Sequence, residues 1–359
     1  MPDKRIFVSA GDLSGEIHAA DLVREIKKIE PACFISAEGG ENLKSVADEF
    51  VENIVDINAF GFFLVKQFFF FKKLLKRLEK NFKENKPDKI ILTDYYGFHI
   101  FVARLAKKLG IPVYYYVSPQ VWASRSGRIK KLAAVVKKMF VIFPFEEKLY
   151  KDNGVDAVFV GNPLIDKVSQ KDKFEISNPP VIGLFPGSRK SVIKKHMPII
   201  LATAKILQEK LGARFVMFNA DKSLESRLPD YIEFVSDNNQ NKRKSVDIAV
   251  CPSGTVSLEN ALMGIPMVVM YKLAYFNYFI IRLIVKVKYI TIINILADKE
   301  VVPEFIQFDA KPEKIAESVI AQLEPDKYRK KIEELLAFRK TLGVPGVAKR
   351  TAEMILSDK

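Results

Sequence analysis

The chain has 359 residues, of which 48% are hydrophobic and 28% charged, so its composition excludes a disordered or fibrous protein. This length exceeds the ~250 to 300 residues at which single cores give way to several domains, and we expect two. Lys and Arg outnumber Asp and Glu by 57 to 43, a formal net charge of +14. The charge predicts a polyanionic partner without distinguishing nucleic acid from lipid. Two distant cysteines exclude a disulfide framework.

Strands alternate with helices from the start of the chain. A helix near 16–29 follows the first strand. The expected strands of the first half are Arg5–Ala10, Cys33–Ala37, Lys89–Thr93, Val113–Val117, Phe140–Phe143 and Val158–Val160. Alternation of this kind predicts a parallel sheet with helices on both faces.

The pattern restarts after a polar stretch, 166–180, which we interpret as a linker. Three or more helices are expected after Tyr271, where the strand pattern fades, at about 274–288, 311–323 and 326–342. The strands expected between linker and helices are Val181–Phe185, Arg214–Phe218, Asp247–Val250 and Met267–Met270. The predicted class is therefore α/β with two Rossmann-like domains facing across a cleft, 1–168 and 178–340, and a C-terminal helix in 341–359 that packs back on the first domain.

Two turns of the first domain carry carboxylates where ligands bind in such folds. A glycine-containing turn joins the first strand to its helix and holds Asp12, Ser14, Gly15 and Glu16, which favours sugar hydroxyls. A tight structural turn explains these glycines equally well. Asp94 ends the strand Lys89–Thr93 and is placed to act as a general base, or simply to cap the next helix.

Two turns of the second domain combine small residues with a helix start. Phe185 leads into Gly187, Ser188 and Arg189, and backbone amides beside an Arg fork predict a phosphate site. The second turn is expected to bind the diphosphate at a helix N-terminus and ribose through a carboxylate, and its residues are Ser253, Gly254, Thr255 and Glu259. An i to i+4 capping interaction is the alternative role for Glu259.

The stretch 60–83 reads as an amphipathic basic helix that is too short and too charged to span a bilayer. We predict that it lies on an anionic membrane surface, a role also open to the aromatic and basic stretch 271–289. The alternative is a helix that packs on the core with a solvated basic face. The residues assigned to the membrane are Phe62, Phe63, Phe69, Phe70, Lys72, Lys73, Lys76 and Arg77.

The three histidines, His18, His99 and His196, are too scattered for a metal site and are expected at the surface or in packing. The chain also lacks a Walker-type glycine loop, which argues against an NTPase. The start of the chain has no basic stretch followed by a cleavable apolar core, so we expect a cytoplasmic protein. No metal, cofactor or nucleic acid is expected.

Several segments together resemble the lipid-A-disaccharide synthases, in the right order and over essentially the whole chain. The resemblance rests on SAGDLSG (9–15), YVSPQVWA (116–123), FPFE (143–146), FVGNPL (159–164), FPGSR (185–189), SGT (253–255) through Glu259, IPMVVMYK (265–272), NILA (294–297) and VPEFIQ (302–307). Gly97 and Asn162 depart from the family pattern, where an aspartate and a histidine are usual.

The resemblance implies a GT-B fold and a metal-independent, inverting transfer. UDP-2,3-diacylglucosamine would be the donor and 2,3-diacylglucosamine 1-phosphate the acceptor, with UDP and a β-1′,6-linked disaccharide as products, in lipid A biosynthesis in Gram-negative bacteria. By matching position, Asp94 is the base. Asn294, Glu304 and Gln307 join Arg189 on the donor side, and Ser118 and Trp122 join the acceptor side.

The family also implies a peripheral enzyme on the cytoplasmic face of the inner membrane, and a homodimer is one assembly that the sequence leaves open. Two alternatives remain. One is another GT-B nucleotide-sugar transferase or an epimerase, for which the basic aromatic stretch 60–83 would have no use. The other is a catalytically altered relative that only binds lipid, against which Asp94, Arg189 and Glu259 speak.

Overall fold

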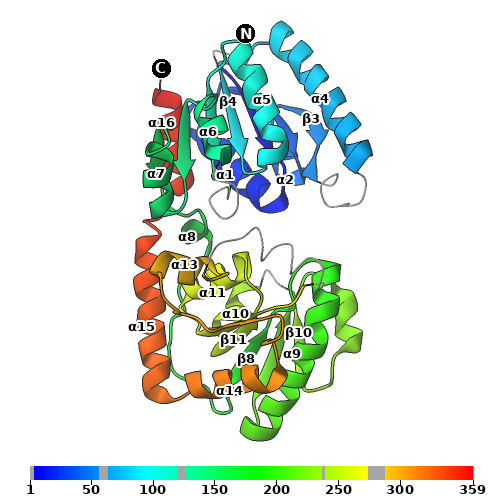
Figure 1. Cartoon of the computed structure of the whole chain (residues 1–359), viewed down its shortest axis with the longest axis vertical. Helices are drawn as coiled ribbons and strands as arrows, with labels where there is room; N and C mark the ends of the chain where they lie inside the picture. Colours follow the sequence, from blue (N-terminus) through cyan, green and yellow to red (C-terminus); the bar gives the residue numbers. More distant parts are fainter. Residues whose placement is uncertain (1–3, 56–63, 120–126, 237–238, 274–287, 359) are drawn as a thin grey trace. The chain divides into compact units, whose positions relative to one another are not determined.

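The computed structural model describes residues 4–55, 64–119, 127–236, 239–273 and 288–358 (Figure 1). The chain forms two compact units. Unit 1 comprises Met1–Pro163 together with Leu342–Lys359, and unit 2 comprises Leu164–Thr341. The second unit is therefore inserted between the body of the first and its last helix.

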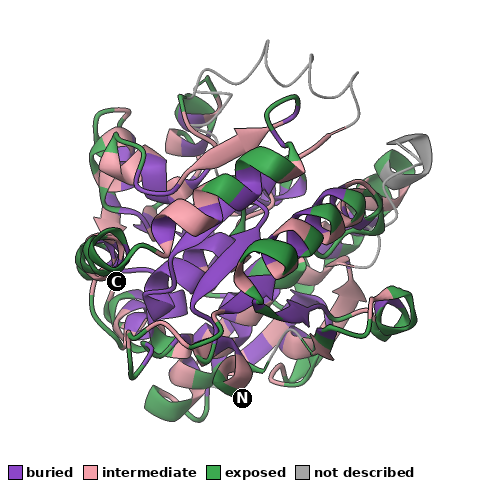
Figure 2. Ribbon diagram, turned by 90° about the horizontal axis from the view of Figure 1, so that it is seen from below, coloured by how far each residue is buried: buried purple, intermediate pink, exposed green. Residues whose placement is uncertain are grey.

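Unit 1 contains a seven-stranded parallel sheet with the order β3-β2-β1-β4-β5-β6-β7. The strands are β1 (Arg5–Ala10), β2 (Phe34–Gly39), β3 (Glu49–Asn53), β4 (Lys89–Thr93), β5 (Val113–Tyr116), β6 (Lys138–Val141) and β7 (Ala157–Phe159). The central strands are almost fully buried, because helices cover both faces of the sheet. Figure 2 shows buried strands flanked by helices whose outer sides carry exposed residues.

Alternation along the strands divides the core of unit 1 into two faces. Tyr115 and Phe7 lie on the face packed by α4 (Leu64–Glu84), α5 (Tyr96–Lys108) and α6 (Gly127–Ala133). Tyr114 and Val8 lie on the opposite face, packed by α1 (Leu13–Ile29), α2 (Glu41–Lys44) and α16 (Val347–Ser357). Helix α7 (Pro144–Lys151) joins β6 to β7. The connections after β1 and β4 therefore leave the sheet toward different faces, which makes the junction of these two strands its topological switch point.

Unit 2 contains a six-stranded parallel sheet with the order β10-β9-β8-β11-β12-β13. Its strands are β8 (Val181–Leu184), β9 (Arg214–Phe218), β10 (Ile232–Val235), β11 (Ile248–Cys251), β12 (Met267–Tyr271) and β13 (Glu304–Ile306). The helical elements are α8 (Leu164–Lys167), α9 (Lys190–Leu211), η2 (Lys222–Arg227), α10 (Gln240–Lys244), α11 (Thr255–Met263), α13 (Ile292–Ala297), α14 (Pro312–Gln322) and α15 (Pro325–Thr341). The switch point of this sheet lies between β8 and β11.

Three strands were not expected from the sequence: β3, β10 and β13. Each lies at the edge of its sheet, is three to five residues long and is mostly half-buried or exposed. Edge strands of this kind lack the apolar run that identifies a central strand. Helices follow Tyr271 as expected, but the sheet also continues there, because β13 pairs with β12 in parallel.

The polar stretch read as a linker is fastened to unit 2. Lys171 is buried and donates from Nζ to the Val246 carbonyl at 2.7 Å, beside the Asp247 carboxylate at 3.4 Å. The other oxygen of Asp247 accepts the backbone N–H groups of Ser177 and Val181. A buried carboxylate therefore ties this stretch to the first strand of the second sheet.

Candidate functional site

The turn after β4 places Asp94 at the carboxyl end of the unit 1 sheet, next to the turn after β1. Its backbone N–H donates to the Val117 carbonyl at 3.0 Å, and its carbonyl accepts from the Tyr115 hydroxyl and from His99 Nδ1 at 3.0 Å. Its Oδ1 accepts the Tyr95 N–H at 2.8 Å. Every backbone polar group of Asp94 is thus engaged, which holds the side chain at the switch point.

Asp94 and Tyr95 are consecutive left-handed residues, with φ of 49° and 42°. Non-glycine residues adopt this region rarely, and each such residue costs of the order of 1 kcal/mol or more. The turn after β1 accommodates this backbone only because residue 11 is glycine: a Cβ there would lie 2.2 Å from the Tyr95 ring. Strain concentrated at one turn beside a carboxylate is typical of a functional position.

Asp94 belongs to a group of carboxylates with Asp12 and Glu146. The pKa of Asp94 is raised to about 7, first by burial and then by the charge of Asp12, a hydrogen bond with Asp12 and the charge of Glu146. Two carboxyl groups this close cannot both be ionised without mutual repulsion, which favours a proton on Asp94. Asp12 also accepts the Gly15 N–H at 2.6 Å as the N-cap of α1.

Ser118 and Glu146 support the turn that contacts Asp94. The Ser118 hydroxyl donates to Glu146 Oε1 at 2.5 Å, and both side chains are buried. Glu146 Oε2 accepts the N–H of Phe143 at 3.1 Å and so caps α7. The structure therefore places Ser118, an expected acceptor residue, one position after the residue whose carbonyl holds Asp94.

The remaining residues of the first turn divide into exposed and buried positions. Ser14 is exposed, whereas Gly15 and Glu16 are buried. Glu16 accepts from Asn42 Nδ2 at 2.7 Å and lies under the start of α2, where a Cβ on Gly40 would be 2.6 Å from its carboxylate. Its carboxylate thus stabilises the junction of α1 and α2.

A buried polar chain that the sequence interpretation missed lies under Asp94. Ser9 Oγ lies 2.7 Å from Glu38 Oε1 and 2.7 Å from His99 Nε2, and His99 Nδ1 reaches the Asp94 carbonyl. The histidines, expected at the surface or in packing, are all buried. A glutamate inside the strand after Phe34 is the sequence feature that could have revealed this chain, because an unpaired charge is costly in a buried strand.

In unit 2 the turn after β8 carries Gly187, Ser188 and Arg189 to the switch point. Gly187 is left-handed with φ of 104°, and Arg189 is the exposed N-cap residue of α9. The first turn of α9 contains no acidic side chain. Free amides, a positive helix end and a guanidinium together form an arrangement that binds anions.

Two buried side chains fix this turn, and neither was predicted. Asn219 donates from Nδ2 to the Gly187 carbonyl at 2.7 Å. His196 Nε2 accepts the Lys272 N–H at 3.1 Å, so its Nδ1 carries the proton that reaches the Pro186 carbonyl at 3.1 Å. Burial lowers the pKa of His196, which keeps the ring neutral and links the turn to the segment after β12.

The turn after β11, the strand beside β8, exposes a second helix start. Gly254 has φ of 146° and precedes Thr255, the first residue of α11, and both are exposed. The first turn of α11 also lacks an acidic residue. Ser253 donates from Oγ to the Ile290 carbonyl at 2.7 Å. Two helix N-termini therefore open at the carboxyl ends of neighbouring strands.

Glu259 has a partner in Arg243. The guanidinium donates to Glu259 Oε2 at 2.5 Å and lies over the rings of Phe185 and Phe218, at 5.1 and 5.8 Å from their centroids. Arg243 is 3% exposed. This ion pair connects α10 to α11. It lies beside Phe185, the residue that leads into the turn with Gly187. In this structure the Glu259 carboxylate is therefore already bound to Arg243.

Asn294, Glu304 and Gln307, assigned to the donor side, are engaged with the protein itself. Glu304 accepts the N–H groups of Ile290 and Thr291 at 2.8 and 2.9 Å and the amide of Asn294 at 2.8 Å. The Asn294 Oδ1 accepts the N–H groups of the loop before β13. Gln307, left-handed with φ of 55°, bonds both backbone groups of Leu273. Their contacts order the segments around the donor turns.

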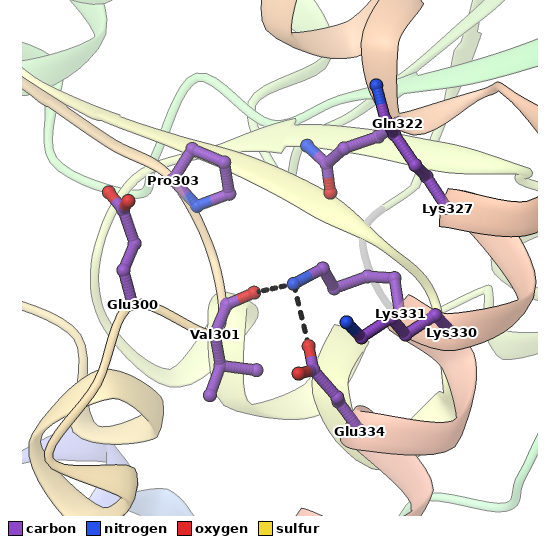
Figure 3. Close-up of a pocket in the computed structure, with 8 residues that line it drawn as sticks. All are labelled: Glu300, Val301, Pro303, Gln322, Lys327, Lys330, Lys331 and Glu334. Carbon is purple, nitrogen blue, oxygen red and sulfur yellow. Dashed lines mark hydrogen bonds and ion pairs between the residues drawn. The ribbon is translucent and has the colours of Figure 1, made fainter.

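A pocket of about 310 Å³ lies elsewhere in unit 2, beside the loop before β13 and the helices α14 and α15 (Figure 3). Lys331 points into it and bonds the Val301 carbonyl and Glu334. Gln322 reaches the carbonyl of Met267, the first residue of β12, so the pocket lies at the amino end of that strand. It is therefore separate from the turns described above.

Helix α4 packs against the core of unit 1 along one stripe and exposes two phenylalanines of its N-terminal half. Leu74, Leu78 and Phe82 are buried, and Phe70 and Phe71 pack partly against the same core. Phe68 and Phe69 are each 63% exposed. The basic residues Lys72, Lys73, Lys76 and Arg77 are exposed, and Arg77 bonds Glu52 at 2.9 Å. Within the described residues, no helix is long and apolar enough to cross a membrane.

Three assigned residues lie outside the described part of the chain: Phe62, Phe63 and Trp122. The same holds for most of the second aromatic and basic stretch, at 274–287. Over the ranges that the structure does describe, no group of three or more His, Cys, Asp or Glu side chains could hold a metal ion.

Solved structures share this architecture of two parallel-sheet units. The UDP-GlcNAc 2-epimerase from Neisseria meningitidis, bound to UDP-GlcNAc, aligns with a TM-score of 0.66 at 14% identity and covers 99% of this chain and all of its own. MurG from Acinetobacter baumannii aligns with a TM-score of 0.64 at 16% identity, over 99% of this chain and all of its own. These likenesses show that the fold is GT-B.

Relatives with higher sequence identity match almost the whole chain. The lipid-A-disaccharide synthase of Syntrophus aciditrophicus is 38% identical over 99% of this chain and 98% of its own. That of Geobacter metallireducens is 35% identical over 99% of this chain and 97% of its own. The family model for lipid-A-disaccharide synthetase matches residues 6–354. The chain that carries the carboxylates of unit 1 and the two glycine-containing turns of unit 2 therefore belongs to the lipid-A-disaccharide synthetase family of glycosyltransferases.

Proposed function

We propose that this enzyme joins UDP-2,3-diacylglucosamine to 2,3-diacylglucosamine 1-phosphate, giving a β-1′,6-linked disaccharide 1-phosphate and UDP. Asp94 is the observation that carries the proposal. Its carboxylate lies at a sheet switch point, in strained backbone, and burial brings its pKa to about 7. A base is most effective when its pKa is near the working pH.

The proposed step is a single displacement with inversion. Asp94 takes the proton of the acceptor's 6-hydroxyl group as that oxygen forms a bond to the donor's anomeric carbon. The bond from that carbon to the diphosphate oxygen breaks, and the electron pair leaves with UDP. Burial and the neighbouring charge of Asp12 raise the pKa of Asp94 to about 7, so Asp94 can take up and release a proton near neutral pH.

The departing diphosphate requires compensation of its charge, which we assign to unit 2. The N-termini of α9 and α11 point free amides to the carboxyl ends of β8 and β11, and Arg189 adds a fixed cation. The internal bonds of Asn294, Glu304 and Gln307 make them positioning residues for the segments around this site. Ser118 and Ser14 are the acceptor-side candidates in unit 1.

We further propose that the enzyme works as a peripheral protein on the cytoplasmic face of the inner membrane, where acylated sugars are held. The support is the start of α4, which exposes Phe68 and Phe69 beside Lys72, Lys73 and Lys76. Aromatic rings next to lysines suit the interface of an anionic bilayer. Phe70 packs against the core, so we leave it out of this surface.

The test of the reaction is UDP release from the purified enzyme supplied with both diacylated substrates. The substitution Asp94→Asn keeps the shape and the Tyr95 hydrogen bond but cannot accept a proton. We expect kcat to fall by ~10²- to 10⁴-fold with UDP affinity unchanged. Asp152→Asn is the matched control, because Asp152 is exposed and forms only a surface ion pair with Lys148.

Two results would contradict the proposal in different ways. Absence of UDP release by the unmodified enzyme with these substrates rejects the substrate assignment. Near-normal turnover by the Asp94→Asn enzyme, with the substrates accepted, rejects only Asp94 as the base.

A further inference from the structure

A continuous line of hydrogen-bonding groups runs under the Asp94 turn through three buried side chains. Glu38 on β2 contacts Ser9 on β1, Ser9 contacts His99 on α5, and His99 contacts the Asp94 carbonyl. The three contact distances are 2.7, 2.7 and 3.0 Å, and the three side chains are fully buried. Hydrogen bonds of this length each require one proton between the two atoms.

The state of the histidine ring follows from what it faces. A carbonyl oxygen only accepts, so His99 Nδ1 must carry a proton to bond Asp94. In a neutral ring Nε2 is then an acceptor, and the proton between Nε2 and Ser9 must come from the serine hydroxyl. The Tyr115 hydroxyl cannot donate its proton to His99 Nδ1, because it donates that proton to the same Asp94 carbonyl.

The same count of protons determines the protonation state of Glu38. Ser9 has one hydroxyl proton, and His99 uses it. The 2.7 Å contact from Ser9 Oγ to Glu38 Oε1 therefore needs a proton on the carboxyl group. The second carboxyl oxygen, Oε2, is buried and has no hydrogen-bond partner among the described residues, a placement that would be costly for an ionised group.

The same proton could instead reside on the histidine, giving an imidazolium and an ionised Glu38 joined through Ser9. Burial opposes this arrangement at both ends, because it raises the pKa of Glu38 to about 7 and lowers the pKa of His99 to about 4. The charges facing Glu38 from other elements are Arg77 on α4 and Glu52 on β3. These two pair with each other at 2.9 Å, so they largely cancel.

We propose that Glu38, Ser9 and His99 are positioning residues for the reaction, forming a neutral chain in which Glu38 holds a proton and His99 fixes the Asp94 carbonyl. The catalytic part of this inference rests on the proposed role of Asp94 as the base. The chain reaches Asp94 at its backbone, where φ is 49°, and so sets the direction of the carboxylate without touching it.

The first experiment compares two substitutions of one residue by steady-state kinetics with the diacylated substrates. Glu38→Gln keeps the size and donates from its amide to Ser9, so we expect kcat within about twofold of the unmodified enzyme. Glu38→Leu keeps the volume and removes the donor, which leaves a buried hydroxyl without its partner. We expect its kcat to fall about tenfold with KM unchanged, and Ser9→Ala to behave in the same way.

The second experiment is independent of activity. Infrared spectra of the whole protein below pH 7 should contain a protonated carboxyl band that Glu38→Gln removes. The same difference should be found in the background of Asp94→Asn, since the chain does not need the Asp94 side chain. Denaturant unfolding should add a third readout: Glu38 binds its proton more tightly when folded, so stability is lost as pH rises from about 4.5 to about 7, and Glu38→Gln should flatten that slope.

The outcomes separate this inference from the proposed reaction. A Glu38→Gln enzyme as impaired as Glu38→Leu, or an unchanged carboxyl band, overturns the protonated chain even if Asp94 is the base. If the band is found but Glu38→Leu and Ser9→Ala keep full kcat, the positioning role is overturned. Should Glu38→Leu fail to fold, Ser9→Ala and the infrared spectra still decide the question.

Discussion

The two sheets of this protein present opposite chemistry at the same topological place. At the switch point of unit 1, between β1 and β4, Asp12, Asp94 and the nearby Glu146 bring carboxylates together in strained backbone. At the switch point of unit 2, between β8 and β11, two helices begin without any acidic residue, and Arg189 is exposed. On the function proposed above, the same fold serves proton removal in one unit and anion binding in the other.

The difference shows that the side chains at the turns, and not the fold, determine the chemistry of each site. Both sites contain a glycine-containing turn between a strand and a helix. In each unit the helix that follows such a turn begins at the carboxyl edge of the sheet. In unit 1 Asp12 caps α1 with its own carboxylate, which satisfies the helix start and places negative charge there. In unit 2 the N-cap residues of α9 and α11, Arg189 and Gly254, form no side-chain cap, and Ser257 accepts only the Gly254 N–H, which leaves amides of both helix starts available.

The largest expected effect among these variants concerns the proposed lipid surface on α4 of unit 1. Replacing Lys72, Lys73 and Lys76 with glutamine removes three charges, each worth about 1 kcal/mol near an anionic bilayer. We expect the affinity for vesicles with anionic lipid to fall by ~100-fold, while UDP binding stays unchanged. Cosedimentation with vesicles measures the first quantity and calorimetry the second.

The matched control for this variant lies in unit 2. Lys205, Lys210 and Lys330 are equally exposed, and replacing them with glutamine changes the net charge by the same amount. If this control loses as much vesicle affinity as the α4 variant, the binding is a matter of total charge and the α4 surface is not a membrane site.

The next effect tests the anion site of unit 2. Arg189→Ala removes a guanidinium from the start of α9, and a charge-assisted hydrogen bond of this kind contributes about 1.5 to 3 kcal/mol. We expect UDP to bind ~10- to 100-fold more weakly in calorimetry. Arg214→Ala is the control, because Arg214 is exposed at the amino end of β9 in the same sheet. Equal affinities for the two variants would move the phosphate site away from α9.

A smaller effect tests the carboxylate pair of unit 1. Asp94 must be ionised to accept a proton, so kcat/KM should rise with pH with a midpoint near 7. Asp12→Asn removes the neighbouring charge but can still cap α1. The midpoint should therefore move to lower pH while remaining above 3.8, because burial, the larger cause, persists. A midpoint that does not move would show that another group controls the profile.

The smallest effect uses a position where this sequence departs from its family. Gly97 is exposed in the first turn of α5, a Cβ there would meet nothing within 4 Å, and that turn contains no acidic residue. Gly97→Asp should stabilise unit 1 by about 1 kcal/mol through lower backbone entropy and the helix dipole. Urea unfolding measures the change, and Gly97→Ala separates the entropy from the charge. Destabilisation by both would show that the glycine conformation itself matters.

The sequence predicted the central strands and the turns that carry Asp94 and Arg189, because buried parallel strands are apolar runs ended by polar or glycine residues. It did not predict what Glu259, Asn294 and Glu304 bond. Their partners are a buried arginine and backbone groups brought together by folding, and no spacing rule connects these positions. The contacts of Asp94 with Asp12 and with the chain through His99 were equally invisible, since they join strands whose order the sequence does not state.

The interruption of unit 1 by unit 2 has a consequence for how the chain matures during synthesis. Helix α16 completes the hydrophobic core beside α1, with Val347, Ala352 and Ile355 packed near Ala19 and Val23. Lys89 on β4 holds the last turn of that helix through the carbonyls of Ile355 and Asp358. Domains that emerge from the ribosome fold in sequence order when they are continuous. Here unit 2 leaves the ribosome whole while the carboxylate-bearing unit still lacks its final helix, so the part of the enzyme made first is the part finished last.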